Sequence, residues 1–348
     1  MPVSLPPALE LSLGLLRCPT CRTRRTHRTH RTRHAGHLRP TADLRALRCP
    51  AGHTFDIARH GYAGLLTGSR AISGDDAAMV RARARFLSSG VYAPVRDVTA
   101  RLAATAVPSG AAHGSAPGAA PGARPGTERA TVVDVGCGTG YYLAGVLDRL
   151  PGARGLGLDT SVRALRSAAR AHTRAAAIAW DVFRPFPLAD GVADVVLDVF
   201  APRNPAEFHR VLRAAGRLIV VRPTGRHLAE LRGRLPGMVM VDPAKEERLH
   251  RRLGPFFDAV GTELVEYAAP LSGPDALDLV AMTPSARHMG HADLAEDGVP
   301  PDPATQAARI AQATHITQAA RVTQFTQVSQ VTQVTVTVSV LATAYRRR

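Results

Sequence analysis

The 348-residue sequence predicts an α/β protein with a mainly parallel sheet, preceded by a smaller N-terminal domain. Three observations support this prediction. From residue 131 onward, apolar runs typical of buried strands alternate with helical segments. A glycine-rich turn follows the first of these runs. Two pairs of metal-binding side chains occur before residue 54.

The N-terminal region, residues 15–68, holds both pairs of metal-binding side chains. They are Cys18-x2-Cys21 and Cys49-x3-His53. Such pairs suit a tetrahedral zinc ion, because each tight turn presents two ligands while the loop between the turns can vary in length. Four protein ligands fill the coordination sphere, so the pattern predicts a structural Zn2+ site in a zinc ribbon. The alternative is that the four residues are unrelated.

The net charge of +16 is concentrated in the same region. Ten arginines and one acid, Asp43, lie between Arg17 and Arg48. This density favours a polyanionic partner, and a zinc ribbon within it is suited to binding RNA. A purely structural clip is the alternative. His27 and His30 lie in a Thr/His/Arg repeat, a setting that favours solvent exposure over zinc binding.

Two segments of different composition connect this region to residue 131. Residues 69–106 are predicted to form a helical connection, broken near Gly90 and Pro94. Residues 107–130 are a Pro/Gly/Ala linker whose composition cannot build a core.

The main domain is predicted to span residues 131–290. The expected strands are 130–136, 155–159, 177–182, 192–200 and 217–223, and the expected helices are 141–150, 161–172 and 205–216. Strands that alternate with helices indicate a parallel sheet covered on both faces. In such sheets, ligands bind at the carboxyl ends of the strands.

The C-terminal part combines two patterns. Residues 291–333 are a low-complexity Thr/Gln insertion in which glutamine recurs every six and then every three residues, and we expect it to be disordered or aggregation-prone. Residues 334–348 are predicted to form a final strand with a basic tail, because valine occupies every second position from Val334 to Val340. Residues 322–345 carry no charge but are too polar to span a bilayer, so no membrane association is expected.

The glycine-rich turn has the sequence VVDVGCGTGYY, residues 132–142. Gly136, Gly138 and Gly140 let a backbone approach a ligand closely. Tyr141 occupies the position of the third glycine in a dinucleotide fingerprint, which disfavours NAD and FAD. A tight turn that binds no ligand is the alternative.

Three aspartates occur at the ends of successive predicted strands. Asp134 precedes the glycines and can meet an ammonium group, Asp159 can accept both hydroxyls of a ribose, and Asp181 can reach an adenine amino group. S-adenosyl-L-methionine offers all three of these groups. The ordered set therefore predicts that S-adenosyl-L-methionine is the cofactor.

Together these stretches resemble the bacterial 23S rRNA (guanine-N1)-methyltransferases, which include the tylosin-resistance methyltransferases of actinomycetes. The similarity extends over residues 15–105, 131–290 and the last strand. It is carried by CPTC, CPAGHTFDIARHGYAGLL, SGDDAAMVRARARFLSSGVYAPVRD, VVDVGCGTGYY, GLGLDTSVRALRSAAR, PFPLADGVADVVLDVFAP, RVLRAAGRLIVVRPTGRHLAELRG and MTPSARH. The glycine turn alone is common, whereas its combination with the ribbon and FDIARHGY is specific.

The resemblance implies a class I (Rossmann-like) methyltransferase fold with an N-terminal zinc ribbon. It implies methylation of guanine N1 in a domain II hairpin of 23S rRNA, with nucleotide 748 as the first guess, and resistance to tylosin-like macrolides. It also implies a homodimer. Carried over by position, cofactor contacts come from Tyr92, Gly138, Thr139 and His227.

Guanine N1 carries a proton that must leave during methyl transfer. Asp198, at the end of a predicted strand, is the candidate general base. The alternative is that positioning alone suffices and water takes the proton. The following stretch FAPRN, residues 200–204, is expected to shape the base pocket, with Arg203 near the RNA backbone.

Two other function classes remain open. One is a small-molecule methyltransferase with a merely structural ribbon, and the other is a non-catalytic RNA-binding protein. The arginine-dense ribbon argues against the first, and the intact acids and glycines argue against the second. With four cysteines in metal-binding or buried settings and no signal peptide apparent, we expect a cytoplasmic protein.

Overall fold

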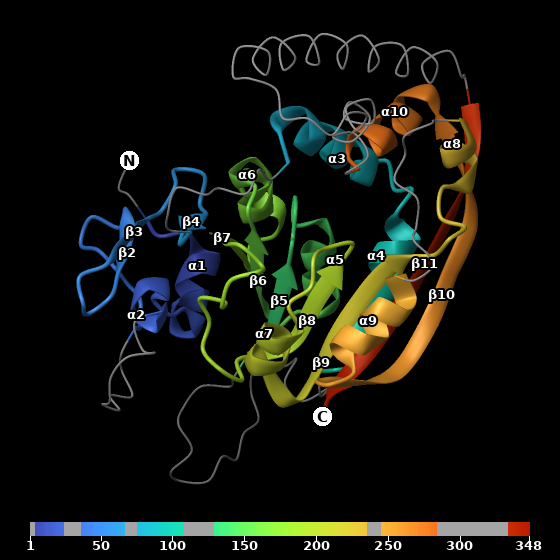
Figure 1. The fold of residues 1–348 in the computed structure, drawn as a ribbon. Helices are drawn as coiled ribbons and strands as arrows, with labels where there is room; N and C mark the ends of the chain where they lie inside the picture. The colour runs from blue at the N-terminus through green and yellow to red at the C-terminus, as the bar shows by residue number, and fades with distance from the viewer. Residues whose placement is uncertain (1–3, 24–35, 67–74, 108–128, 235–244, 284–332) are drawn as a thin grey trace, which may run out of the picture.

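The computed structural model describes residues 4–23, 36–66, 75–107, 129–234, 245–283 and 333–348 (Figure 1). The predictions for His27 and His30, for most of the 107–130 linker and for all but the last residue of the 291–333 insertion lie outside these residues. Among the described helices, none has the length and apolar character needed to cross a bilayer.

An eight-stranded sheet forms the centre of the molecule, with strand order β10-β11-β9-β8-β5-β6-β7-β4. Neighbouring strands from β9 to β4 pair in parallel, whereas β11 pairs antiparallel with both β9 and β10. The strands are β4 (Ala63–Gly64), β5 (Thr131–Val135), β6 (Arg154–Asp159), β7 (Ala175–Ala179), β8 (Ala193–Val199), β9 (Leu212–Pro223), β10 (Phe257–Ser272) and β11 (Gln333–Arg347). This arrangement confirms the predicted α/β class.

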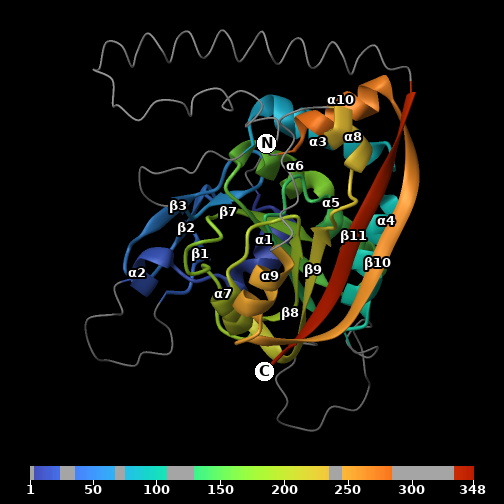
Figure 2. The ribbon, with the colours of Figure 1, turned by 45° about the vertical axis from the view of Figure 1, so that its right-hand side comes forward.

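Helices cover both faces of this sheet (Figure 2). One buried cluster joins α3, α4, α5 and α10 to one face, and a second joins α1, α7, α9 and the N-terminal region to the other. The helices are α1 (Pro7–Ser12), α2 (Pro19–Thr23), α3 (Ala77–Ser88), α4 (Ala93–Ala104), α5 (Tyr141–Arg149), α6 (Val162–Ala171), α7 (Pro205–Val211), α8 (Ala229–Arg234), α9 (Lys245–Leu253) and α10 (Gly273–Ala281).

The break predicted near Gly90 is present between α3 and α4. Asp76 caps α3, because its carboxylate accepts hydrogen bonds from the N–H groups of Ala78 and Met79. Gly90 follows this helix with φ +84°, a left-handed conformation that suits glycine. The chain can then turn and begin α4 directly after Tyr92.

The N-terminal region forms a small antiparallel sheet of β1 (Arg39–Pro40), β2 (Ala46–Arg48) and β3 (Thr54–Asp56). It is not a separate body. Within the predicted 15–68 range, β4 pairs with β7 as an edge strand of the large sheet. The N–H of Arg17 also donates to the carbonyl of Pro187 at 2.8 Å.

Two predicted elements differ from the structure. The helix expected over 205–216 ends at Val211, because Leu212 is already extended and begins β9. The expected strand 217–223 is therefore only the second half of β9, which shifts register against β8 between Ala193 and Val195. The long strand β10 was not predicted at all.

The final strand is present as predicted and lies inside the sheet. Val334, Val336, Val338 and Val340 of β11 are all buried in the cluster shared with α4 and α5. Strand β11 lies between β9 and β10, so both of its edges are hydrogen-bonded.

Candidate functional site

The four predicted metal ligands come together in one cluster. One ligand atom from each of Cys18, Cys21, Cys49 and His53 lies within 4.8 Å of all the others. Cys18 and Cys49 are buried, while Cys21 and His53 are partly exposed. The sequence prediction of this set is thus matched by the geometry.

The spacing within the cluster matches the edges of a zinc tetrahedron. Bond lengths near 2.3 Å to sulfur and 2.0 Å to nitrogen give edges of about 3.5–3.8 Å. The distance from Cys21 Sγ to Cys49 Sγ is 3.7 Å, and His53 Nδ1 lies 3.3–3.6 Å from the three sulfurs. The donor set therefore fits zinc, with Nδ1 as the nitrogen that faces the thiols.

Tight turns present these ligands. The N–H of Gly52 donates to the carbonyl of Cys49 at 2.9 Å, and the N–H of Cys49 donates to the carbonyl of His53 at 3.0 Å. Gly52 has φ +86°, which a residue with a side chain rarely adopts. Glycine in the CPAGH sequence is thus required by the turn that brings Cys49 and His53 together.

The glycine turn connects β5 to α5 at the carboxyl edge of the sheet, next to β6. The N–H groups of Gly136 and Cys137 both donate to the carbonyl of Leu158, at 2.8 and 3.1 Å. Gly136, Gly138 and Gly140 have φ values of +73°, +53° and +84°. All three glycines are therefore required by the backbone path.

Two of these glycines make room for the protein rather than for a ligand. A Cβ on Gly136 would lie 2.7 Å from Ala201 Cβ, and one on Gly140 would lie 2.9 Å from Ala171 Cβ. At Gly138 the nearest atom would be Nη1 of Arg83, at 3.4 Å. Packing therefore requires glycine at Gly136 and Gly140, while the contact of the three glycines with a cofactor stays a prediction.

Asp159 and the glycine turn are joined directly. The N–H of Gly138 donates to Asp159 Oδ2 at 2.9 Å, and the N–H of Ser161 donates to Oδ1 at 2.8 Å. Burial raises the pKa of Asp159 despite these hydrogen bonds. Thr139, next in the turn, is partly exposed. The carboxylate is thus held in a fixed orientation at the end of β6.

Asp134 is buried beneath the turn. Its Oδ2 has no hydrogen-bond donor among the described residues. Burial, followed by repulsion from Asp159 and Asp198, raises its pKa to about 8. A buried carboxyl oxygen without a donor costs free energy, and a bound cation or hydrogen-bond donor would relieve that cost.

Asp181 lies two residues beyond β7 and is also buried. Its Oδ1 accepts a hydrogen bond from the N–H of Phe183 at 2.9 Å, and Arg184 Nε lies 3.6 Å from Oδ2. The structure therefore places Asp134, Asp159 and Asp181 at the carboxyl edge of three neighbouring strands or directly after it, as the sequence predicted.

Tyr92 and His227 contact each other although they lie 135 positions apart. The N–H of Ser339 on β11 donates to His227 Nδ1 at 3.2 Å. Burial and the nearby Arg232 lower the pKa of His227 to about 4, so the ring is neutral and its proton is on Nε2. Nε2 then donates to the Tyr92 hydroxyl oxygen at 3.1 Å. This leaves the hydroxyl hydrogen of Tyr92 available to another acceptor.

Phe200 completes an aromatic group around this pair. Its ring stacks on His227 with centroids 6.0 Å apart, and it lies 6.2 Å from Tyr92 and 6.3 Å from Tyr142. Phe200 is 40% exposed and has φ +55°, an unusual backbone conformation for a phenylalanine. Its position directly after β8 puts an exposed aromatic ring at the carboxyl edge of the sheet.

Asp198 lies on the strand next to Asp134, and its charge helps to raise the pKa of Asp134. Strand alternation places Asp198 on the face of Val196, which packs with Phe208, whereas Leu197 packs with Leu143 on the opposite face. Its side chain is fully buried and lies 3.2 Å from Arg203 Nε. A general base must reach its substrate, so the role of Asp198 as that base stays a prediction. Arg203 pairs inward, where the sequence suggested an RNA contact.

One residue near the turn was missed by sequence reasoning. Arg83 of α3 lies beside Gly138, donates to the carbonyl of Met282 at 2.8 Å and pairs with Asp75. The packing of α3 on α10 brings it there. No spacing in the sequence could have indicated this contact.

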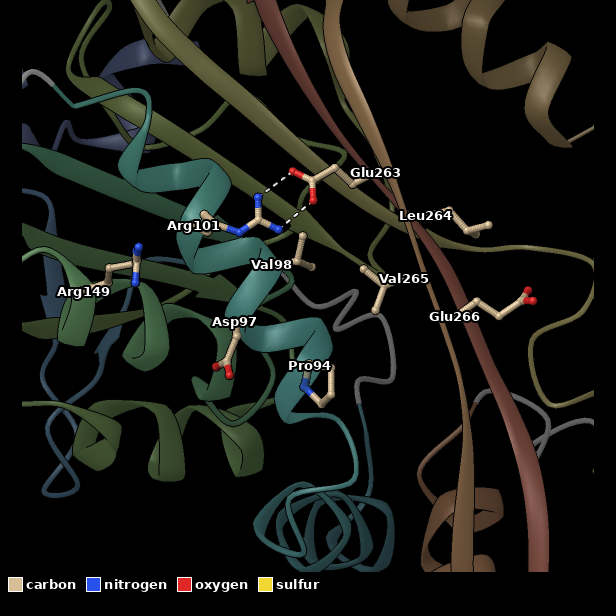
Figure 3. Close-up of a pocket in the computed structure, with 9 residues that line it drawn as sticks. All are labelled: Pro94, Asp97, Val98, Arg101, Arg149, Glu263, Leu264, Val265 and Glu266. Atoms are coloured by element: carbon tan, nitrogen blue, oxygen red, sulfur yellow. Dashed lines mark hydrogen bonds and ion pairs between the residues drawn. The ribbon is translucent and has the colours of Figure 1, made fainter.

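A pocket of about 510 Å³ lies elsewhere, between α4 and β10 (Figure 3). Arg101 closes one side of it by donating two hydrogen bonds to Glu263, at 2.8 and 2.6 Å. None of the predicted cofactor or metal residues lines this pocket. We therefore place the candidate site at the glycine turn.

Comparisons with known proteins identify the domain that contains the glycine turn. Residues 132–225 match the family model described as a methyltransferase domain. A 23S rRNA (guanine(748)-N(1))-methyltransferase of Streptomyces fradiae is 44% identical over 251 residues, which cover 72% of this chain and 83% of the relative.

Two further relatives bear names for the same class of reaction, 23S rRNA guanine-N(1) methylation. The protein from Micromonospora griseorubida is 45% identical over 275 residues, which cover 79% of this chain and 87% of the relative. The protein from Bacillus subtilis (strain 168) is 33% identical over 217 residues, or 56% of this chain and 70% of the relative. The fold, the methyltransferase domain and these identities together place the chain in the family of 23S rRNA (guanine-N1)-methyltransferases.

Proposed function

We propose that this enzyme transfers a methyl group from S-adenosyl-L-methionine to N1 of a guanine in 23S rRNA, with nucleotide 748 as the first target to test. The observation that carries the proposal is the joint position of the glycine turn, Asp159 and the Tyr92–His227 pair at one edge of the sheet. The names of the relatives supply the nucleotide and the atom.

The residues at this edge fit the cofactor. Asp159 is oriented so that it could accept the ribose hydroxyls, and Asp181, two residues after the next strand β7, could accept from the adenine amino group. The Oδ2 atom of Asp134, which has no hydrogen-bond donor among the described residues, suits a cationic group. The nearby carboxyl groups of Asp159 and Asp198 favour a cation at the same place. When bound, the cofactor supplies an electrophilic methyl group on a sulfonium.

The glycine turn and the aromatic pair would hold the other parts of the cofactor. The backbone at Gly136, Gly138, Thr139 and Gly140 lines the approach from β5. The free hydroxyl hydrogen of Tyr92, held by His227, can meet an acceptor such as a carboxylate.

Positioning of the base is the catalytic contribution we assign to this chain. Guanine N1 must lie in line with the methyl group, with its proton free to leave. The exposed ring of Phe200 offers a stacking surface for a base turned out of its hairpin. Asp198 is buried and paired, so we propose that water takes the proton.

We assign a structural Zn2+ ion to Cys18, Cys21, Cys49 and His53. The tetrahedral spacing of their ligand atoms supports this assignment. All four ligands come from the protein, which leaves no open position for a substrate. The ion would hold the turns of the ribbon together.

The experiment that tests the function is primer extension across domain II of 23S rRNA from cells with and without this gene. A methyl group on guanine N1 blocks Watson–Crick pairing, so reverse transcriptase should stop one nucleotide before the target. A new stop one nucleotide before nucleotide 748 supports the proposal. If a folded protein that binds S-adenosyl-L-methionine produces no stop, the small-molecule alternative replaces it.

Resistance to tylosin-like macrolides is a second, dependent proposal. It follows from the resemblance to the tylosin-resistance methyltransferases and requires the same methylation. The test is the inhibition profile of a sensitive host that expresses the gene. An unchanged profile, in cells whose rRNA is methylated, rejects the resistance role alone. Homodimer formation also stays a prediction, which the mass of the protein in solution would test.

A further inference from the structure

Three arginines of α6 share one face of the helix. Arg163, Arg166 and Arg170 are spaced three and four residues apart, which aligns their side chains, and all three are exposed. The opposite face, with Ala164, Leu165 and Ala168, is buried. The helix therefore has a fixed orientation, with its basic face directed to solvent.

A loop from the ribbon adds a fourth arginine beside this helix. Arg59 is exposed and lies between β3 and β4, two residues before Gly61. A Cβ on Gly61 would lie 3.6 Å from Ala169 Cβ of α6, so the loop is packed directly on the helix. Figure 1 shows the same neighbourhood, with α6 next to β4.

The pKa of His60 reflects the positive charges at this junction. Its pKa is lowered first by partial desolvation and then by repulsion from Arg166, Arg59 and Arg170. No carboxylate contributes to its shift. Two segments that are a hundred residues apart thus present their positive charges to the same place.

These arginines have no carboxylate partner among the described residues, although Arg59 Nε donates to His60 Nε2 at 3.3 Å. Among the described residues, none of the four forms an ion pair with a carboxylate. On α4, by contrast, Arg96 pairs with Asp97 at 3.0 Å and Arg101 pairs with Glu263 at 2.6 Å. The arginines of α4 are used within the protein, whereas those of α6 are available to an external anion.

We propose that Arg59, Arg163, Arg166 and Arg170, here called the α6 patch, bind consecutive phosphates of the RNA substrate. The inference rests on the proposed function and extends it. Helix α6 begins three residues after Asp159, so the patch runs from the cofactor edge to the ribbon. The patch forms a path of positive charge along which the RNA backbone can pass from the ribbon to the cofactor edge of the sheet.

The salt dependence of binding measures phosphate contacts. Each neutralised phosphate changes the slope of log K against log[salt] by about 0.7 for single strands and 0.9 for duplex. Loss of three contacts should therefore make the slope less steep by between about 2 and 3. A structural role for these side chains would not change the slope.

The experiment compares two triple variants in binding to a domain II transcript of 23S rRNA. The patch variant is Arg163→Ala, Arg166→Ala and Arg170→Ala, and alanine preserves the helix. The control variant removes three other exposed arginines, Arg149, Arg251 and Arg252. We expect the patch variant to lose about 10- to 100-fold in affinity at moderate salt, with the shallower slope, and the control to lose less than about 3-fold.

Methylation kinetics complete the test. The patch variant should raise the KM for RNA while kcat at saturating RNA and the affinity for S-adenosyl-L-methionine stay unchanged. An unchanged slope, or equal losses in both variants, overturns the α6 patch. The wild-type enzyme separates this result from the proposed function. If it methylates the transcript, the proposed function stands whatever the patch variant does. If it neither binds nor methylates RNA, the proposed function is wrong.

Discussion

The ribbon and the large sheet maintain their folds by different means. The ribbon strands β1, β2 and β3 have only two or three residues each, and the four ligand side chains converge between them. The large sheet contains strands of up to 16 residues, with buried clusters on both faces. The ribbon therefore has short strands and a set of metal-binding side chains, while the sheet has extensive apolar burial.

The two regions nevertheless share one core. Cys18, Leu47 and Phe55 of the ribbon belong to the same buried cluster as Val133 and Val196 of the sheet. The difference teaches that the ribbon can be fixed in place by the sheet and still need a metal for its own turns. The predictions below separate these two contributions.

Loss of the metal should have the largest effect and should divide the two regions most clearly. Structural zinc contributes on the order of 10 kcal/mol in small zinc domains, so the Cys49→Ser variant should lose zinc and ribbon structure. RNA methylation should fall by more than about 100-fold, since the ribbon region adjoins the α6 patch. The affinity for S-adenosyl-L-methionine, measured by calorimetry, should change little.

The control for this prediction is Cys137→Ala, which removes a cysteine outside the cluster. It should keep one zinc per chain by elemental analysis. If Cys49→Ser retains wild-type zinc content and activity, the ribbon does not depend on the ion.

Gly140→Ala tests the sheet region, where packing is decisive. The new Cβ would lie 2.9 Å from Ala171 Cβ and 3.1 Å from Ala168 Cα, at a residue with φ +84°. We expect a loss of about 2–4 kcal/mol in the free energy of unfolding, from strain and overpacking together. Urea denaturation measures it.

Gly191→Ala is the matched control. Gly191 also has positive φ, +59°, but no atom lies within 4 Å of its virtual Cβ. It should lose only the backbone contribution, about 1 kcal/mol. Equal losses in the two variants would show that packing at α6 does not matter.

The Asp134→Asn variant should lose affinity for the cofactor and gain stability in the folded sheet. Between the pKa of an unfolded aspartate and the folded value of about 8, the folded wild type keeps a proton that the unfolded chain has lost. Wild-type stability therefore falls as pH rises through this window, on the order of 1 kcal/mol per pH unit. The variant has no such titration.

The difference in Tm between the variant and wild type should thus grow from pH 5 to about 8 and then level off. Thermal scans across this range provide the measurement. The affinity for S-adenosyl-L-methionine should fall in the variant at every pH. A Tm difference that is independent of pH would contradict the burial of an ionisable carboxyl.

Tyr92→Phe should have the smallest effect. It removes one hydroxyl whose hydrogen bond to His227 is internal, and leaves the ring in contact with Phe86 and Phe200. We expect a loss of about 3- to 10-fold in cofactor affinity from one hydrogen bond, and a loss of about 1 kcal/mol in the free energy of unfolding, because the buried Nε2–H of His227 is left without its acceptor. Calorimetric titration measures the affinity. A variant that loses stability but keeps wild-type affinity for S-adenosyl-L-methionine would make Tyr92 a packing residue only.

Much of the site could be predicted because it is encoded locally. Cys18, Cys21, Cys49 and His53 are two short-spaced pairs, and the glycine turn follows directly on its strand. Asp159 and Asp181 could be placed because parallel strands end at one edge. These features depend on nearby residues and on the period of the fold.

The remaining features depend on tertiary contacts that no local pattern encodes. Strand β10 is exposed along one side and has few strongly apolar alternations, so only its pairing with β11 defines it. Arg83 reaches the glycine turn through helix packing, and the strand register puts Asp198 on the sheet face of Val196, opposite that of Leu197. The pairing of Asp198 with Arg203 likewise could not be read from their separation.

The position of β11 has a consequence for how the enzyme is made. This strand follows β10 by some sixty residues in the chain but lies between β9 and β10 in the sheet. Its Ser339 N–H holds His227, so the Tyr92–His227 pair can be completed only after β11 has emerged from the ribosome and inserted. Strands with such distant partners pair late in folding. A chain in which β11 has not yet paired would thus lack a finished Tyr92–His227 pair.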